Sequence, residues 1–217
     1  MNSMPDEREG FASFLLRMRA LGINNRDLFA AVEATPRRSF VPAQWQHAVW
    51  SVGMIPIECG EALEGIDLQA RALAALDPAP GQRVLEIGAG SGFTSAVLGR
   101  MAGRILSVER FRTLAGLATQ RLEALSLSNV VVRHADGSKG MPADGPFDRI
   151  IVWAAFDAYP RAFVDMLSTG GVMVAPIGPA EGAQVLVRLS KVGSRFERED
   201  IAEVRLQPLV SGMAEII

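Results

Sequence analysis

From residue 83 onward, short apolar runs alternate with segments of helical pattern, and this alternation constrains the fold more than any other feature of the chain. The runs are rich in valine, isoleucine and leucine, and their length is typical of buried strands. Expected strands lie at 84–87, 105–108, 130–132, 150–153, 172–176 and 185–189, and expected helices at 92–102, 112–126 and 160–168. Because strands joined by helical crossovers pair in parallel, the pattern predicts a doubly wound α/β sheet.

The last part of the chain follows a different pattern. Residues 183–192 and 196–207 both have strand-like composition, and only residues 193–195 separate them. A connection this short permits only antiparallel pairing. The sequence therefore predicts a mostly parallel, seven-stranded sheet with an antiparallel end.

The N-terminal third is expected to be mainly helical. Residues 10–35 show two stretches of helical spacing separated near Gly22, and residues 66–76 show another. Prolines make residues 35–42 read as an extended segment. Residues 43–65 form a linking segment, so we expect an N-terminal helical cap placed over a ligand site on the sheet.

Size and composition fit one compact domain in a reducing compartment. The chain has 217 residues, of which 49% are hydrophobic and 21% are charged. We expect residues 1–80 to form the cap with its loop and residues 81–217 to form the α/β core. The single cysteine, Cys59, makes no internal disulfide. Residues 1–7 are polar and acidic, unlike a secretory leader, so we expect a cytoplasmic protein.

Charge and hydropathy exclude several other classes of function. The net charge is −2 with no basic stripe, which argues against a nucleic-acid partner. No apolar stretch approaches the roughly 20 residues of a membrane span. With 2 histidines, 1 cysteine and no ligand spacing between them, we expect no metal site.

A glycine-rich turn follows the first expected strand and opens a helix. Residues 84–93 read V-L-E-I-G-A-G-S-G-F, with Phe93 where a dinucleotide fingerprint has its third glycine. Glu86, just before the turn, would repel a pyrophosphate at the helix N-terminus. The same carboxylate suits a cofactor with cationic groups and no phosphate, such as S-adenosylmethionine with its sulfonium and amino groups. The alternative is a glycine-rich turn that binds no ligand.

Acidic residues follow the next two strands. Glu109 ends the second strand, where a carboxylate can accept both hydroxyls of a ribose. Asp136 follows the third strand, where its carboxylate can contact the edge of an adenine. Glu109 alone would be interpreted as a surface carboxylate, but the carboxyl ends of parallel strands meet in one crevice. The predicted cofactor-binding residues are Glu86, Gly88, Ala89, Gly90, Gly92, Glu109, Arg110, Asp136 and Gly137.

These motifs resemble those of class I methyltransferases, which have a Rossmann-like fold. Residues 83–92 are similar to the first motif of that class, residues 107–109 to its second, and residues 135–137 to its acidic turn after the third strand. The resemblance implies S-adenosylmethionine as the cofactor.

Other segments resemble one family within that class, the protein-L-isoaspartate O-methyltransferases. Residues 35–42 (T-P-R-R-S-F-V-P) resemble its P-R-x-x-F-V-P segment, and residues 54–57 (M-I-P-I) resemble its L-P-I-G. Residues 146–155 and 170–178 resemble P-F-D-x-I-I-V-T-A-A and G-G-R-x-V-x-P-x-G. The resemblance spans about residues 25–210. It implies methylation of isoaspartyl carboxyl groups in damaged proteins, as a step in protein repair.

The chain departs from that family on the acceptor side. The family has G-Q-T-I-S-Q-P after L-P-I-G, whereas this chain has Ala62 in place of the threonine and Glu64 in place of the serine. Glu58 and Glu61 add further negative charge. Trp153 also stands where the family has threonine.

Glu64 is the candidate catalytic residue, and its direction decides which acceptor fits. An isoaspartyl acceptor is anionic, and two unit charges about 4 Å apart repel by about 4 kcal/mol at an effective dielectric of 20. A Glu64 carboxylate facing the acceptor would therefore disfavour isoaspartate, although it could accept a proton from a neutral hydroxyl or amine. Alternatively, Glu64 points to solvent.

Three functions remain open at this point. The first is methylation of isoaspartyl groups, and the second is methylation of another protein, peptide or small-molecule acceptor. The third is S-adenosylmethionine binding without methyl transfer. Intact cofactor motifs beside an altered acceptor loop are compatible with all three.

Overall fold

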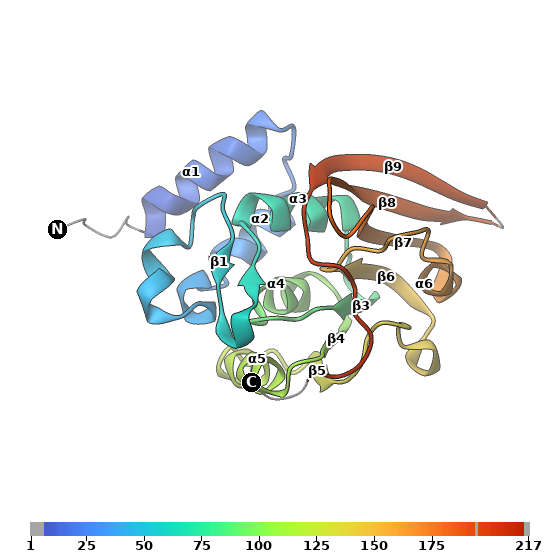
Figure 1. The fold of residues 1–217 in the computed structure, drawn as a ribbon. Coiled ribbons are helices and arrows are strands. Elements are labelled where there is room, and N and C mark those ends of the chain that lie inside the picture. The colour runs from blue at the N-terminus through green and yellow to red at the C-terminus, as the bar shows by residue number, and fades with distance from the viewer. Residues whose placement is uncertain (1–6, 194, 215–217) are drawn as a thin grey trace.

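A seven-stranded sheet in the order β5-β4-β3-β6-β7-β8-β9 organises the chain (Figure 1). The structure is a computed structural model and describes residues 7–193 and 195–214. Most of the polar N-terminal stretch 1–7, on which the cytoplasmic expectation rests, and Ser194 in the connection 193–195 lie outside the described residues. The strands are β3 Arg83–Ile87, β4 Arg104–Glu109, β5 Val130–His134, β6 Phe147–Val152, β7 Leu167–Ile177, β8 Gln184–Val192 and β9 Arg195–Val204.

The pairing of the strands confirms the mostly parallel sheet. Strand β3 pairs in parallel with both β4 and β6, β4 with β5, and β6 with β7. Strand β9 is antiparallel to β8, as the short connection between them predicts, and β8 is also antiparallel to β7. The chain passes from one side of β3 to the other between β5 and β6, and ligands of open α/β sheets bind at such a switch point.

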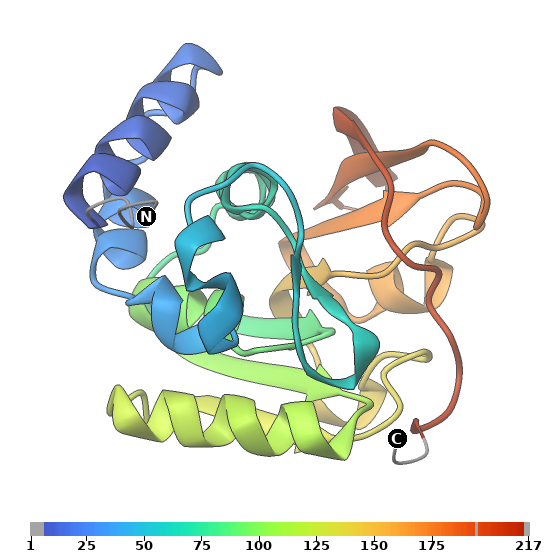
Figure 2. The same ribbon diagram turned by 60° about the vertical axis from the view of Figure 1, so that its left-hand side comes forward.

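Helices cover the two faces of the sheet unequally. Helices α3 Ile66–Leu76, α4 Phe93–Met101 and α5 Arg112–Ala124 pack on one face, whereas α6 Arg161–Asp165 is the only α-helix of the described residues on the other face (Figure 2). Alternate residues of each strand serve the two faces. In β6, Ile151 joins the larger core, and Ile150 joins the smaller one. Helix α6 ends earlier than the expected 160–168 because β7 begins at Leu167.

The two N-terminal helices form a layer outside α3 and α4. Helix α1 Glu7–Ala20 packs on α3, and α2 Arg26–Glu33 packs on α4. Residues 37–40, expected to be extended, form a 3₁₀ turn instead. The turn buries Arg37 and Phe40, and the Phe40 ring lies 5.7 Å edge-on from Phe93. Tertiary packing therefore overrides the extended preference that the prolines suggest.

The linking segment contains a small hairpin that its sequence did not predict. Strands β1 Ile55–Pro56 and β2 Ala62–Leu63 pair antiparallel. The turn between them places Cys59 and Gly60 at positive φ, 62° and 72°. Two-residue strands give too short an alternation to be recognised from sequence.

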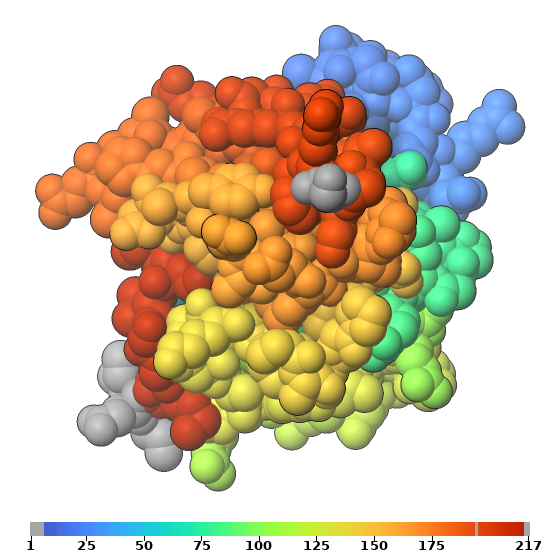
Figure 3. Space-filling view, turned by 90° about the vertical axis from the view of Figure 1, so that its right-hand side faces the viewer, coloured from blue at the N-terminus to red at the C-terminus, as the bar shows by residue number. Residues whose placement is uncertain are grey.

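The last described residues leave the sheet and cross its carboxyl edge. In Figure 3 this segment (red) descends from the β8–β9 region past the chain near residue 140 (yellow). Among the described residues, none of the helices combines the length and apolarity needed to traverse a bilayer.

Asn25 caps α2, and its removal has a defined expected cost. Its side-chain oxygen accepts a hydrogen bond from the Leu28 amide at 2.9 Å. We expect Asn25→Ala to lower the free energy of unfolding by about 1 kcal/mol, as loss of an N-cap does. Urea titration measures it. Asn24→Ala is the control, because the exposed Asn24 amide makes only a 3.4 Å contact with the Gly22 carbonyl. Equal effects of the two substitutions would contradict the capping role.

Candidate active site

A cavity of about 500 Å³ lies at the carboxyl ends of the central strands. The ends of β3, β4 and β6 and the chain after β5 supply one side. The hairpin segment 54–64 and the C-terminal segment 205–210 supply the rest. Of the predicted site residues, those that line the cavity are Gly88, Glu109, Arg110, Gly137 and Glu64.

The glycines of the turn after β3 are required by geometry. Gly88 and Gly92 have φ of 86° and 89°, a region that side chains rarely adopt. A Cβ on Gly92 would lie 2.9 Å from the Ala118 Cβ, so this glycine lets α5 approach the turn. Gly88 faces the cavity, whereas Ala89, Gly90 and Gly92 shape the turn behind it.

Glu109 lines the cavity and also holds the glycine-rich turn. It is 4% exposed, and its carboxylate accepts hydrogen bonds from the Gly90 amide at 2.8 Å and the Phe111 amide at 2.9 Å. Each carboxylate oxygen has a second lone pair. The carboxylate therefore has acceptor capacity left for a ligand hydroxyl.

The sequence analysis predicts Glu86 as a cofactor-binding residue, but in the structure its side chain lies behind the cavity wall and does not line the cavity. Its carboxylate is fully buried and accepts hydrogen bonds from the hydroxyls of Thr94, Ser95 and Ser107, and from the Trp153 indole at 3.1 Å. Burial raises the pKa of Glu86, and the hydrogen bonds oppose that shift. Glu86 reaches the cavity only through Trp153, which lines it.

Asp136 secures the C-terminal segment. Its carboxylate accepts from the Ser138 amide and from the Gly212 amide, both at 2.8 Å, and the Ser138 bond is the main cause of its lowered pKa. The adjoining Ala135 and Gly137 line the cavity, whereas Asp136 does not. Asp136 therefore positions one wall of the site.

Arg110 supplies a positive charge to the cavity. Its Nε is buried and has no hydrogen-bond partner among the described residues. Its carbonyl accepts a hydrogen bond from the Ala214 amide at 3.1 Å, which ties the C-terminal segment to the end of β4. Arg110 therefore lines the cavity and, through its backbone, also holds the C-terminal segment.

Two carboxylates of the hairpin segment line the same cavity. Burial raises the pKa of Glu64 to about 7. Burial, and then repulsion from Glu109, raises the pKa of Glu61, while Arg110 acts in the opposite direction. Glu58 does not belong to this group, because it pairs with Arg121 at 3.5 Å outside the cavity lining.

The C-terminal wall was missed by the sequence reading. The Ala155 amide donates to the Gln207 carbonyl, and the Leu209 amide donates to the Ala155 carbonyl, each at 2.8 Å. These bonds hold residues 205–210 along the cavity. The only signal in the sequence was Pro208, which interrupts the strand pattern after β9. Neither α1 nor α2 contributes a residue to the cavity lining. The N-terminal cap therefore reaches the cavity through the hairpin segment and not through these helices.

The raised pKa of Glu64 makes stability depend on pH. The folded chain holds a proton on Glu64 up to about pH 7, whereas the unfolded chain releases it near 4.5. The contribution of Glu64 protonation to the free energy of unfolding is therefore full below about pH 4.5 and is lost as the pH rises toward 7. We expect Glu64→Gln to gain stability relative to the wild type across that window. Thermal unfolding from pH 4.5 to 8 measures the difference, and parallel curves would contradict the burial of this carboxyl group.

Comparison with known proteins gives a consistent result over nearly the whole chain. The family model described as protein-L-isoaspartate(D-aspartate) O-methyltransferase (PCMT) matches residues 12–214. A "Protein-L-isoaspartate O-methyltransferase" of Rhizobium meliloti (strain 1021) is 48% identical over 202 residues, which are 93% of this chain and 99% of the relative.

Solved structures of similar fold support the architecture. One is a putative protein-L-isoaspartate O-methyltransferase from Plasmodium falciparum in complex with S-adenosyl-L-homocysteine, with a TM-score of 0.76, 20% identity and coverage of 91% of this chain and 97% of that one. Another protein-L-isoaspartate O-methyltransferase has a TM-score of 0.79 at 23% identity, covering 94% of this chain and 67% of that one. With a full-length family match and a relative at 48% identity, the chain belongs to the protein-L-isoaspartate(D-aspartate) O-methyltransferase family.

Proposed function

We propose that this protein transfers the methyl group of S-adenosylmethionine to isoaspartyl carboxyl groups of damaged proteins. The observation that carries the proposal is one cavity shared by two sets of residues. The ends of β3 and β4 and the turn after β5, which hold the methyltransferase motifs, meet the hairpin segment in which the family carries its acceptor-side residues. The names of the relatives support the same substrate.

The lining of the cavity fits this cofactor. Glu109 offers a carboxylate with spare acceptor capacity for ribose hydroxyls, and Gly88 and Gly137 line the same cavity. When bound, S-adenosylmethionine supplies a methyl group on a positively charged sulfur. The lining holds three carboxyl groups, those of Glu61, Glu64 and Glu109, against two arginines, Arg110 and Arg205, and when all three are ionised this excess of negative charge favours a cationic ligand.

The residues of this chain would contribute mainly position. An isoaspartyl carboxylate is already nucleophilic and needs no general base. The walls formed by segments 54–64 and 205–210 would hold it in line with the methyl group and limit access of water. Proximity and orientation would then provide most of the rate enhancement.

A second candidate function is methylation of a neutral acceptor, favoured by Glu64. This carboxyl group lines the cavity, and its pKa of about 7 suits a general base at neutral pH. An ionised Glu64 would repel an isoaspartyl carboxylate but could accept a proton from a hydroxyl or amine.

Transfer from labelled S-adenosylmethionine separates these functions. An isoaspartyl peptide, the same peptide with normal aspartate, and a cell extract serve as acceptors. Selective labelling of the isoaspartyl peptide supports the proposal, and labelling of extract components alone supports another acceptor. If no acceptor is labelled but calorimetry shows that S-adenosylhomocysteine binds, the result supports cofactor binding without methyl transfer. NAD is the calorimetric control, and we expect it not to bind.

Glu109→Ala tests the ribose role. We expect cofactor binding to weaken by about 1.5–3 kcal/mol, the range for hydrogen bonds to a charged group. Calorimetry with S-adenosylhomocysteine measures the change, and circular dichroism checks the fold because Glu109 also holds the Gly90 amide. Glu123→Ala, which removes an exposed carboxylate from α5, is the control. Unchanged affinity in folded Glu109→Ala would remove Glu109 from the ribose role.

The double substitution Ala62→Thr with Glu64→Ser tests charge on the acceptor side. We expect isoaspartyl activity to rise at pH 8, where Glu64 is mostly ionised, and to rise less at pH 6. A tenfold increase corresponds to about 1.4 kcal/mol. The measurement is kcat/KM of both proteins with one isoaspartyl peptide at the two pH values. Robust wild-type activity that is equal at both pH values would show that Glu64 does not oppose the acceptor.

A further inference from the structure

The hairpin segment is a closed loop whose two ends touch. We call residues 51–64 the acceptor segment; four of its members, Met54, Glu61, Ala62 and Glu64, line the cavity. A Cβ on Gly65 would lie 2.0 Å from the Val52 carbonyl oxygen, so glycine is required where the ends meet. The middle of the segment is a hairpin of two-residue strands, and its tip contacts α5 through the Glu58–Arg121 pair at 3.5 Å, while the contacts at its base fix its two ends.

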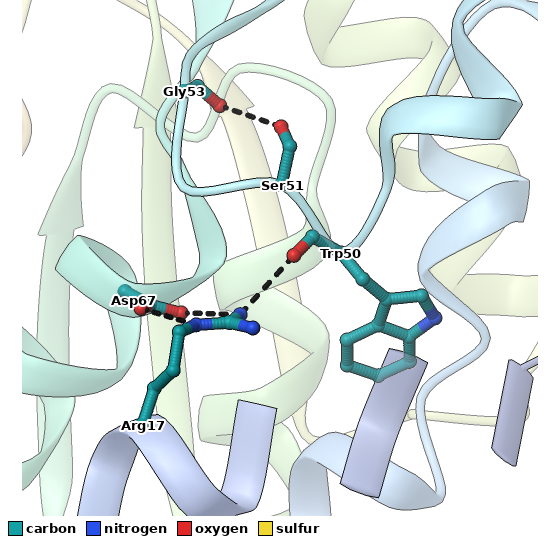
Figure 4. Close-up of polar contacts among 5 residues, drawn as sticks. All are labelled: Arg17, Trp50, Ser51, Gly53 and Asp67. Carbon is teal, nitrogen blue, oxygen red and sulfur yellow. Dashed lines mark hydrogen bonds and ion pairs between the residues drawn. The ribbon is translucent and has the colours of Figure 1, made fainter. Parts of the chain in front are cut away.

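An arginine of α1 holds the start of this segment (Figure 4). The Arg17 Nε and Nη2 bind the two carboxylate oxygens of Asp67, in the first turn of α3, at 2.7 and 2.8 Å. The same Nη2 donates to the Trp50 carbonyl at 3.1 Å. Helix α1 also lies directly on the Trp50 ring, because a Cβ on Gly10 would lie 2.1 Å from the Trp50 Cδ1. One guanidinium therefore joins α1, α3 and the residue that precedes the acceptor segment.

A second arginine holds the end of the segment in the same way. Arg37 is 1% exposed, and its Nη2 donates to the Glu64 carbonyl at 2.7 Å. Its Nη1 donates to the side-chain oxygen of Gln69, the fourth residue of α3. The guanidinium carbon lies 4.4 Å from the centre of the Phe93 ring, at the start of α4 and directly after the glycine-rich turn.

The two arrangements share one design. Each arginine binds a main-chain carbonyl at one end of the acceptor segment and a side chain near the start of α3. The planar guanidinium fork permits such simultaneous contacts, which a single ammonium group does not reproduce. An ion pair alone would hold α1 against α3; the contact with the Trp50 carbonyl extends that hold to the acceptor segment.

We propose that Arg17 and Arg37 are positioning residues that fix the acceptor segment relative to the cofactor turn. The N-terminal cap thus sets affinity for the methyl acceptor although α1 and α2 contribute nothing to the cavity lining. A segment fixed at both ends loses fewer conformations when the acceptor binds. This inference rests on the proposed function for its kinetic part, whereas the ordering of residues 51–64 is independent of it.

Arg17→Lys is the decisive variant, because Arg17 is only partly buried and lysine keeps the charge opposite Asp67. We expect the KM for an isoaspartyl peptide to rise about fivefold, while kcat and the Kd for S-adenosylhomocysteine stay within about twofold. Amide hydrogen exchange of residues 51–64 should become faster. Arg37→Lys should act in the same direction, but Arg17→Lys carries the test if that buried variant fails to fold.

Arg133→Lys is the matched control. Arg133 also binds a carboxylate through two nitrogens, with Asp144 at 2.7 and 3.0 Å, yet it lines a different hollow at the amino ends of the strands. We expect its KM and the exchange of residues 51–64 to match the wild type.

The outcomes separate the inference from the proposed function. Unchanged KM and unchanged exchange in folded Arg17→Lys would overturn the positioning role, as would equal changes in Arg133→Lys. If the wild type methylates no isoaspartyl peptide, the proposed function is wrong, and amide hydrogen exchange of residues 51–64 is then the test of the positioning role. Faster exchange of residues 51–64 in Arg17→Lys then supports the positioning role, and unchanged exchange overturns it.

Discussion

The buried carboxylate of Glu86 joins the elements that meet at the switch point of the sheet. Its hydrogen bonds reach the first turn of α4 through Thr94 and Ser95, β4 through Ser107, and the end of β6 through Trp153. A carboxyl group without these donors would be strongly disfavoured in a site with no exposure. The strand ends are therefore held in register around one group, and the cavity lies directly outside it. Glu109 repeats the arrangement one strand further along by joining the glycine-rich turn to β4.

Local patterns predicted most of the fold because each one reports on the burial of a single element. The helix expected at 66–76 has those bounds in the structure, and the strands differ from expectation mainly at their ends. Contacts between distant residues were not predicted. The sequence does not indicate which hydroxyl groups bind Glu86. The hydrogen bond from the Gly212 amide to Asp136 joins residues too far apart in the chain for a short motif to predict. The 3₁₀ turn at Arg37–Phe40 likewise depends on Phe93, which comes much later in the chain.

The acceptor side of the cavity poses an electrostatic problem of its own. Glu61 and Glu64 face the space that a methyl donor and an acceptor must share, and both have raised pKa values. Negative charge there suits a sulfonium and opposes a carboxylate. Because burial raises the pKa of Glu64 to about 7, the negative charge on this side of the cavity changes with pH near neutrality.

The wall formed by residues 205–210 has a consequence for how the site assembles. That wall follows β9, whereas the hairpin segment precedes β3, yet both line the same cavity. Contacts between segments so far apart in the chain carry a loop-closure cost that local contacts avoid. A partly folded chain with β3, β4 and β5 already paired would have its glycine-rich turn in place but no enclosed chamber. A ligand that contacts both walls would therefore bind the complete fold in preference to such a partly folded chain, and would stabilise that fold by mass action.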